Sequence, residues 1–193
     1  MKANTRDRII EAGADIIHHK GFNHAGIQEI LHAAGVPKGS FYNFFKNKED
    51  FGLQVIDYFS DHFARAAENT LEDRSVAPLE RIKNILRYFM DYFRSTNFTR
   101  GCPVGNLAQE MGDLSPVFRK KLRRALDRLV NSYAAVLKDA QRAGEISEKI
   151  DVRETACFLV SSWHGALIRM KVVQNIEPLE NHFKYIFDYV LKP

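Results

Sequence analysis

Residues 33–51 read AAGVPKGSFYNFFKNKEDF. Gly35 and Pro37 interrupt a preceding helix, because proline biases the residue before it away from the helical region. A second, very short helix is expected over Lys38–Phe44, about 10 Å long at 1.5 Å per residue, and Asn47 caps the start of a third. A helix, a tight turn and a second helix form the helix-turn-helix motif, whose second helix enters the major groove of DNA. The sequence therefore predicts double-stranded DNA as a partner.

Positive charge is concentrated in the same stretch. The chain carries a formal net charge of +4, and residues 38–48 contain three lysines and no acidic residue. Lys38 and Lys48 each stand at a helix N-terminus, which favours a phosphate group. Gly39 lets the backbone approach DNA closely, and the hydroxyl of Ser40 can reach a base edge. The predicted DNA-binding residues are Lys38, Gly39, Ser40, Tyr42, Asn43 and Lys48.

Aromatic residues of this stretch are expected to face two ways. Phe41, Phe44 and Phe45 include the side chains that must anchor so short a helix to the core of the head. Tyr42 has two open interpretations, because it can contact DNA or pack as one more aromatic side chain. An element that buries so little is best explained as something presented to a partner.

Composition places the chain among ordinary globular proteins. Of its 193 residues, 45% are hydrophobic and 27% are charged, which gives no indication of disorder. No apolar run is long enough for a membrane span, and the N-terminal residues lack the apolar segment of a signal peptide. Two cysteines make no disulfide framework, so a cytoplasmic location is predicted. No cofactor and no metal site are expected.

Helical periodicity extends over the whole chain, and we find no sustained alternation of the kind that marks a strand. The predicted fold is therefore all-α, with nine helices. Three belong to a helix-turn-helix DNA-binding head over residues 1–47, one is a connector, and five complete a regulatory and dimerisation domain over residues 48–193. The expected spans are residues 5–20, 27–34, 38–44, 48–69, 78–94, 103–111, 116–143, 152–171 and a last helix from residue 178.

Small residues on the helix predicted over residues 152–171 indicate an interface. Ser161, Ser162, Gly165 and Ala166 permit another helix to approach closely, and the last helix has a wide apolar face. Together these features predict a homodimer with a four-helix interface across a two-fold axis. Dimerisation also suits the head, since one short helix reads few bases and two half-sites are needed.

The N-terminal part of the chain resembles a known family. The N-terminal pattern of the TetR/AcrR family of transcriptional regulators is matched by Gly21-Phe22, Ile27, Ile30, Ala34-Gly-Val36, Lys38-Gly-Ser-Phe-Tyr42, Phe45, Lys48-Glu49 and Phe51. The resemblance implies an all-helical, dimeric regulator of a palindromic operator, in most members a repressor released by a ligand bound in the body. Two positions depart from the family pattern. Gly26 stands where a Thr or Ser usually caps a helix and touches a phosphate, and Asn43 replaces a more usual His or Trp.

Cys102 is the residue of the body with distinctive chemistry. Pro103 is well placed as the first residue of a helix, so Cys102 is expected at the N-cap, where the helix dipole favours a thiolate. Arg100 adds positive charge nearby. Such a cysteine would be nucleophilic toward electrophiles and oxidants. The alternative is a small, buried and inert side chain.

The body further resembles NemR-type repressors. The matching residues are Gly101-Cys102, Leu107, Glu110, Asp113-Leu-Ser115, Arg119, Lys171 and Glu177-Pro-Leu-Glu-Asn181. Those repressors sense reactive electrophiles and hypochlorite-type oxidants through a cysteine at the position of Cys102, working with a lysine that matches Lys171. The resemblance implies that Cys102 and Lys171 form a sensor whose modification releases the operator. For Lys171 the alternative is a favourable interaction with a helix C-terminus.

Other interpretations remain open at this point. The regulator can respond instead to a small-molecule inducer, a non-covalent apolar ligand, with Cys102 inert. A cysteine enzyme that uses Cys102 with a histidine such as His164 as base would leave the head unexplained, and no enzyme signature is found, so the chain is predicted not to be an enzyme. A plain helical adaptor would be excluded by salt-sensitive binding to a palindromic duplex. Cys157 lies in an apolar run and is predicted to be a buried core residue.

Overall fold

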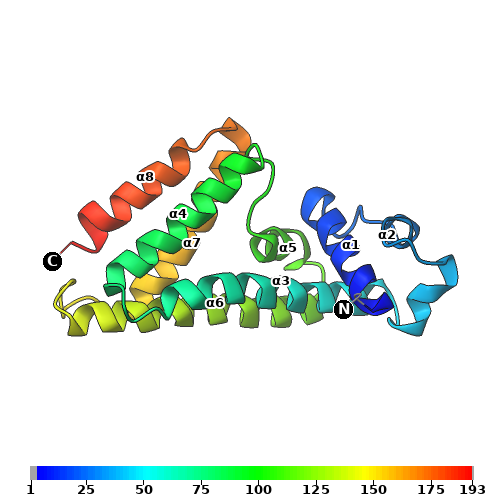
Figure 1. Cartoon of the computed structure of the whole chain (residues 1–193), viewed down its shortest axis with the longest axis horizontal. Helices are drawn as coiled ribbons and strands as arrows, with labels where there is room; N and C mark the ends of the chain where they lie inside the picture. The colour runs from blue at the N-terminus through cyan, green and yellow to red at the C-terminus, as the bar shows by residue number, and fades with distance from the viewer. Residues whose placement is uncertain (1–3, 193) are drawn as a thin grey trace. The chain divides into compact units, whose positions relative to one another are not determined.

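The computed structural model describes residues 4–192, apart from the side chains of residues 63–66 and 68. Its elements are α1 (Thr5–Lys20), α2 (Ile27–Ala33), η1 (Lys38–Asn43), α3 (Lys48–Leu71), α4 (Pro78–Ser95), α5 (Pro103–Met111), α6 (Pro116–Arg142), α7 (Val152–Val173), α8 (Glu177–Tyr185) and η2 (Ile186–Val190) (Figure 1). The described part of the chain contains no strand, so the predicted all-α fold is confirmed. Within residues 4–192, no helix combines the length and the apolar character that crossing a bilayer requires.

The helices form two compact units, and each is discontinuous in sequence. The head unit contains the chain up to His62 together with Pro103–Ala125, and the body unit contains Phe63–Cys102 together with the chain from Leu126. These units do not follow the predicted functional boundary after residue 47, because segment 103–125 packs on the N-terminal helices. The ring centroids of Phe22 and Phe118 lie 5.0 Å apart. Gly52 leaves room for both rings, since a Cβ there would lie 2.4 Å from Phe22 and 2.6 Å from Phe118.

Helix ends lie close to where local sequence signals predict them. Asn47 caps α3 by accepting a hydrogen bond from Asp50 N at 2.8 Å, and Asp151 caps α7 by accepting from Glu154 N at 2.9 Å. Gly21 follows α1 with a φ of 88°, a conformation that glycine adopts without a Cβ penalty. These contacts span three residues or fewer, and this is why the sequence predicts them well.

The segment expected to meet DNA differs in detail from its prediction. The sequence predicts an α-helix over Lys38–Phe44, but Lys38–Asn43 form a 3₁₀-helix. Its hydrogen bonds are of the tighter type, with Ser40 N donating to Pro37 O at 2.9 Å and Phe44 N to Phe41 O at 3.0 Å. Six residues at about 2.0 Å each extend about 12 Å. A helix this short gains little from α-helical cooperativity, so its tertiary anchors decide its geometry.

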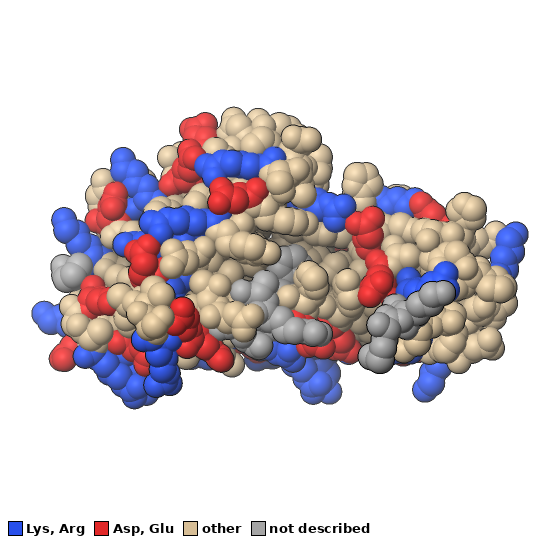
Figure 2. All heavy atoms as spheres, in the orientation of Figure 1, with Lys and Arg blue, Asp and Glu red and all other residues tan. Residues whose placement is uncertain are grey.

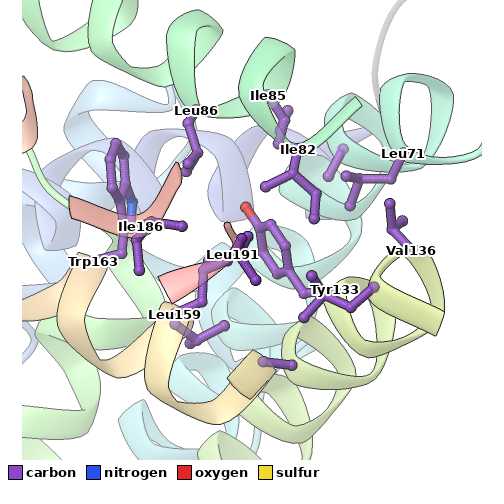
Figure 3. Close-up of a cluster of buried hydrophobic side chains, with 14 of the residues drawn as sticks. Leu71, Ile82, Ile85, Leu86, Tyr133, Val136, Leu159, Trp163, Ile186 and Leu191 are labelled. Atoms are coloured by element: carbon purple, nitrogen blue, oxygen red, sulfur yellow. The ribbon is translucent and has the colours of Figure 1, made fainter. Parts of the chain in front are cut away.

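The core of the body unit is built from α4, α6, α7, α8 and η2 with the end of α3 (Figure 3). Its buried side chains include Leu71, Ile82, Ile85, Leu86, Tyr133, Val136, Leu159, Trp163, Ile186 and Leu191. Arg81 is a charged residue of this unit and is only 6% exposed. Its Nε donates to Val76 O at 2.7 Å, and its Nη1 lies 3.6 Å from Asp139 Oδ2. The buried charge is therefore paired.

One predicted burial is wrong. The sequence predicts Cys157 as a core residue, but its side chain is exposed. Helix α7 turns Ala156, Leu159 and Val160 inward, which places Cys157 and Phe158 on the exposed side of the same apolar run. Consecutive apolar residues surround a helix on all sides, so their hydrophobicity alone does not indicate which face is buried.

Candidate nucleic-acid interface and sensor cysteine

Aromatic side chains of the head unit hold η1 in place. Phe41 is 0% exposed, and its ring centroid lies 5.0 Å from that of Phe45 and 5.5 Å from that of Phe51, near the start of α3. Helix α1 contributes Gly13, where a Cβ would lie 2.3 Å from Phe51 Cζ. Phe44, by contrast, is 38% exposed. The anchors of η1 are therefore Phe41 and Phe45.

The remaining side chains of η1 face outward. Lys38, Gly39, Tyr42 and Asn43 are exposed, and Ser40 is half-buried. Tyr42 is 68% exposed, although its ring lies edge-on to Phe41 at a centroid distance of 5.4 Å. This exposure contradicts the alternative in which Tyr42 is a packed core aromatic. The predicted DNA-binding residues of η1 thus share one short exposed segment.

Gly39 has no structural explanation within the chain. Its φ lies outside the left-handed region that favours glycine, and a Cβ built on it would meet no atom within 4 Å. The backbone at Gly39 is therefore open to close approach from outside the chain, as the sequence predicts for a DNA contact.

Replacing Gly39 by alanine should therefore separate folding from binding. We expect the free energy of unfolding to change by less than about 0.5 kcal/mol, because the new methyl group meets open space. If the backbone at Gly39 lies against the groove as predicted, the added methyl group should lower affinity for operator DNA about tenfold. Urea unfolding and fluorescence anisotropy measure the two effects, and unchanged affinity in G39A would contradict this role of Gly39.

Lys48 begins α3 and is tied to the loop between α1 and α2. Its Nζ donates to Asn23 O at 3.1 Å and lies 4.8 Å from the centre of the Phe22 ring. Burial lowers the pKa of Lys48, and the nearby carboxylate of Glu110 opposes that shift. An ammonium group has three N–H donors, so the bond to Asn23 leaves donors for a phosphate.

Helix α2 begins without the side-chain cap that the family pattern usually provides. Gly26 is the N-cap, with φ −80° and ψ 137°, and no side chain caps the helix. A Cβ at this position would lie 3.9 Å from Glu29 Cβ, an ordinary contact. A serine or threonine would therefore fit, and its absence leaves the first N–H groups of α2 without a side-chain acceptor.

Sequence reasoning missed Arg8 on α1, which supports the turn of the motif. Its Nη2 donates to Ala34 O at 2.6 Å and to Gly35 O at 3.1 Å. Gly35 has a φ of 62°, and a Cβ there would lie 3.1 Å from the same Nη2. Arg8 thus satisfies carbonyls at the end of α2. No local signal could reveal this contact, because it joins residues far apart in the sequence.

The two predicted sensor residues both belong to the body unit. Cys102 is half-buried and packs against the body core, whereas Lys171 is exposed in the last turn of α7. Tyr133 of α6 points into that core (Figure 3). Burial raises the pKa of Tyr133, and the charge of Cys102 raises it further. The thiol therefore lies within electrostatic reach of a buried phenol.

The loop that leads to Cys102 is joined to the end of α7. Gln174 Nε2 donates to Lys171 O at 2.5 Å and to Phe98 O at 3.5 Å. Asn97, Phe98 and Gln174 have φ values of 49°, 59° and 54°, a left-handed conformation that costs a non-glycine residue about 1 kcal/mol or more. The turn that carries Lys171 and the loop before Cys102 are thus neighbours, and both are strained.

Charged side chains of both signs share the visible face of the body unit. Figure 2 shows lysine and arginine side chains interspersed with aspartate and glutamate over the visible face of the body unit. The candidate interface is distinguished instead by exposed polar groups above buried aromatic anchors.

Comparison with known proteins agrees with both halves of the chain. Residues 9–55 match the family model described as bacterial regulatory proteins, tetR family, and residues 78–186 match the tetracyclin repressor-like C-terminal domain. The HTH-type transcriptional repressor DhaR of Mycobacterium sp. (strain GP1) is 36% identical over 96% of this chain and 92% of its own length. The HTH-type transcriptional repressor NemR of Escherichia coli K12 is 26% identical over 98% and 96%.

A solved structure supports the same assignment. The regulatory protein TetR from Rhodobacter sphaeroides superposes with a TM-score of 0.89 at 38% identity, covering 96% of this chain and 97% of that one. The helix-turn-helix predicted from residues 33–51 and the helical body therefore occur together in known regulators. The chain belongs to the TetR family of bacterial regulatory proteins and is a transcriptional regulator, not an enzyme.

Proposed function

We propose that this protein is a cytoplasmic repressor that binds a palindromic operator as a homodimer and is released when Cys102 is modified. The observation that carries DNA binding is η1 itself, in which exposed Lys38, Gly39, Tyr42 and Asn43 stand over buried Phe41. In this proposal Lys38 and Lys48 contact phosphates, Ser40 reaches a base edge, and Tyr42 and Asn43 reach phosphate or base. The name of DhaR, a transcriptional repressor 36% identical to this chain, supports repression.

Dimerisation is supported by apolar side chains that the single chain leaves exposed on α7, α8 and η2. Phe158, Ile168, Val172, Tyr185 and Tyr189 are each at least 46% exposed. Gly165 lies on the same face of α7 as Phe158 and Ile168, and a Cβ built on it would meet nothing within 4 Å. Exposed apolar faces of this kind mark interfaces. A second copy related by a two-fold axis would cover them.

The small residues predicted for this interface divide into two pairs. Ser161 and Gly165 are exposed on α7 and suit close approach of the second copy. Ala166 is 9% exposed and faces the core, and Ser162 Oγ lies 3.0 Å from His182 Nε2 on α8. Two heads in such a dimer would address half-sites about 34–36 Å apart, one turn of DNA.

The sensing role assigned to Cys102 rests on its place in the chain. It is half-buried beside Tyr133 and directly precedes Pro103, the first residue of α5. In one reaction the thiolate adds to an electrophilic carbon and gains a bulky group at this confined position. In the other, a two-electron oxidant converts the thiol to a sulfenic acid, and the Lys171 amine displaces water to form an S–N bond. Both would shift α5.

Replacing Cys102 by serine tests this role, and Cys157 supplies a matched control. The probe is a duplex that the wild-type protein selects from a random pool, and the electrophile is N-ethylmaleimide. We expect N-ethylmaleimide to weaken duplex binding at least tenfold in the wild type and in C157S, and to leave C102S unaffected. Cys157 lies on the α7 face proposed for the dimer, so C157S shows whether release depends on a thiol at that face.

The alternative function is a repressor released by a non-covalent apolar ligand. It predicts that C102S, measured by the same anisotropy, still releases the duplex when inducer is present. Release of C102S by N-ethylmaleimide, or failure of the wild type to respond, would contradict thiol sensing. Loss of the response in C157S alone would move the sensor to the α7 surface.

A further inference from the structure

Glu110, near the end of α5, binds the loop between α1 and α2 through both of its carboxylate oxygens. Oε2 accepts a hydrogen bond from Phe22 N at 2.8 Å, and Oε1 accepts one from Asn23 N at 2.7 Å. Hydrogen bonds to an ionised acceptor are about twice as strong as neutral ones. Two of them at one residue hold the loop at a fixed distance from α5.

Gly21 is shaped to accept this contact. Its φ is 88°, and a Cβ on it would lie 2.9 Å from Glu110 Oε2. The glycine therefore serves two purposes, since it ends α1 and leaves room for the carboxylate. Asn23 adds a third link, because its Nδ2 lies 3.6 Å from Met111 Sδ.

The same loop carries the contact of Lys48. Lys48 Nζ donates to Asn23 O at 3.1 Å and sits over the Phe22 ring, and the Glu110 carboxylate acts on its charge. Glu110 thus binds the N–H groups of Phe22 and Asn23. The ring of Phe22 and the carbonyl of Asn23 are the groups that contact the Lys48 ammonium. If the loop moved away from α5, Lys48 would lose its contacts with the Asn23 carbonyl and the Phe22 ring.

We propose that Glu110 is the positioning residue of the DNA-binding head, acting through loop 21–23 to hold Lys48 where it meets a phosphate. The proposal rests on the DNA-binding function proposed above. It assigns Glu110 no contact with DNA. Glu110 is the second-last residue of α5, the helix whose first residue, Pro103, follows Cys102 in the chain.

The sign of the effect makes the proposal testable. Glu110→Gln removes a negative charge from the head, and general electrostatics alone predict tighter DNA binding. An amide offers one acceptor oxygen, and its NH₂ group would face a backbone N–H, so the contact predicts weaker binding. Glu29→Gln is the control, because it removes the same charge from an exposed pair with Lys20, and the amide oxygen can still accept the hydrogen bond from the Gly26 backbone.

The experiment measures affinity of the full-length protein for the selected duplex at several salt concentrations. We expect E110Q to bind at least tenfold more weakly, with a salt dependence reduced by about one phosphate contact per half-site. E29Q should bind as tightly as the wild type or more tightly. In a K48Q background, E110Q should have little further effect, since both changes remove the same contact.

Each result decides a different question. A wild-type protein that selects no duplex overturns the proposed function and this proposal with it. A wild type that selects a duplex which E110Q binds equally well, with the same salt dependence, overturns only the role of Glu110. If the role of Glu110 were purely structural, E110Q would have a lower unfolding midpoint. Its loss of duplex affinity would then add fully to the loss caused by K48Q, and that additivity would also overturn the proposal.

Discussion

Replacing Phe41 by alanine is expected to cost the head unit about 3–5 kcal/mol of its free energy of unfolding, the usual effect of emptying a buried phenylalanine site. Phe41 is 0% exposed and lies at the centre of the ring cluster formed with Phe45 and Phe51. Because η1 spans six residues, it has no independent stability. Its loss of anchorage should abolish binding to the selected duplex.

Hydrogen exchange is the suitable measurement for F41A, because the two compact units need not unfold together. Amides of α1 and α2 should exchange at least a hundredfold faster in the variant. Phe44→Ala is the control, since Phe44 is 38% exposed and lies three residues after Phe41. Its removal should change stability by less than about 1 kcal/mol. Equal effects of the two variants would contradict the assignment of Phe41 as the anchor.

The second large effect is expected from Arg81→Met in the body unit. Methionine keeps an apolar chain of similar length but loses the donors to Val76 O and Leu71 O and the ion pair with Asp139. Carbonyls left without a donor in the interior cost about 1–3 kcal/mol each, whereas Asp139 is 34% exposed and keeps its pair with Arg142. We expect a loss of about 3 kcal/mol.

Trp163 reports this loss, because it is the one tryptophan of the chain and is 8% exposed in the body core. Urea unfolding followed by its fluorescence should show a lower midpoint for R81M. Arg87→Met serves as control, since Arg87 pairs with Glu80 at the surface and such pairs contribute less than about 1 kcal/mol. If R81M and R87M unfold alike, the Arg81 contacts are not stabilising.

The sequence predicted those parts of the fold that depend on near neighbours. Asn47, Asp151 and Gly21 mark helix ends through contacts within a few residues, and the structure has them as expected. The outward position of Tyr42 followed only once η1 was placed on Phe41. Contacts of Arg8 with Ala34, and of Glu110 with Asn23, join residues 26 and 87 positions apart, so no local pattern indicates them.

Orientation of apolar residues was the other limit. Cys157 stands in an apolar stretch and was expected inside, yet α7 presents it outward together with Phe158. A helix that is apolar on two sides serves two packing surfaces, and sequence periodicity does not rank them. The 3₁₀ form of η1 was missed for a related reason, because anchoring by Phe41 rather than helix propensity sets its geometry.

The discontinuity of the head unit also bears on how the protein is made. A ribosome completes His62 well before Ala125, the last residue that belongs to the head unit. At roughly 5–20 residues per second, the delay is several seconds. During that interval the amides of Phe22 and Asn23 await the carboxylate of Glu110, and Phe22 awaits Phe118. The head unit therefore cannot complete these contacts until the start of α6 has been synthesised.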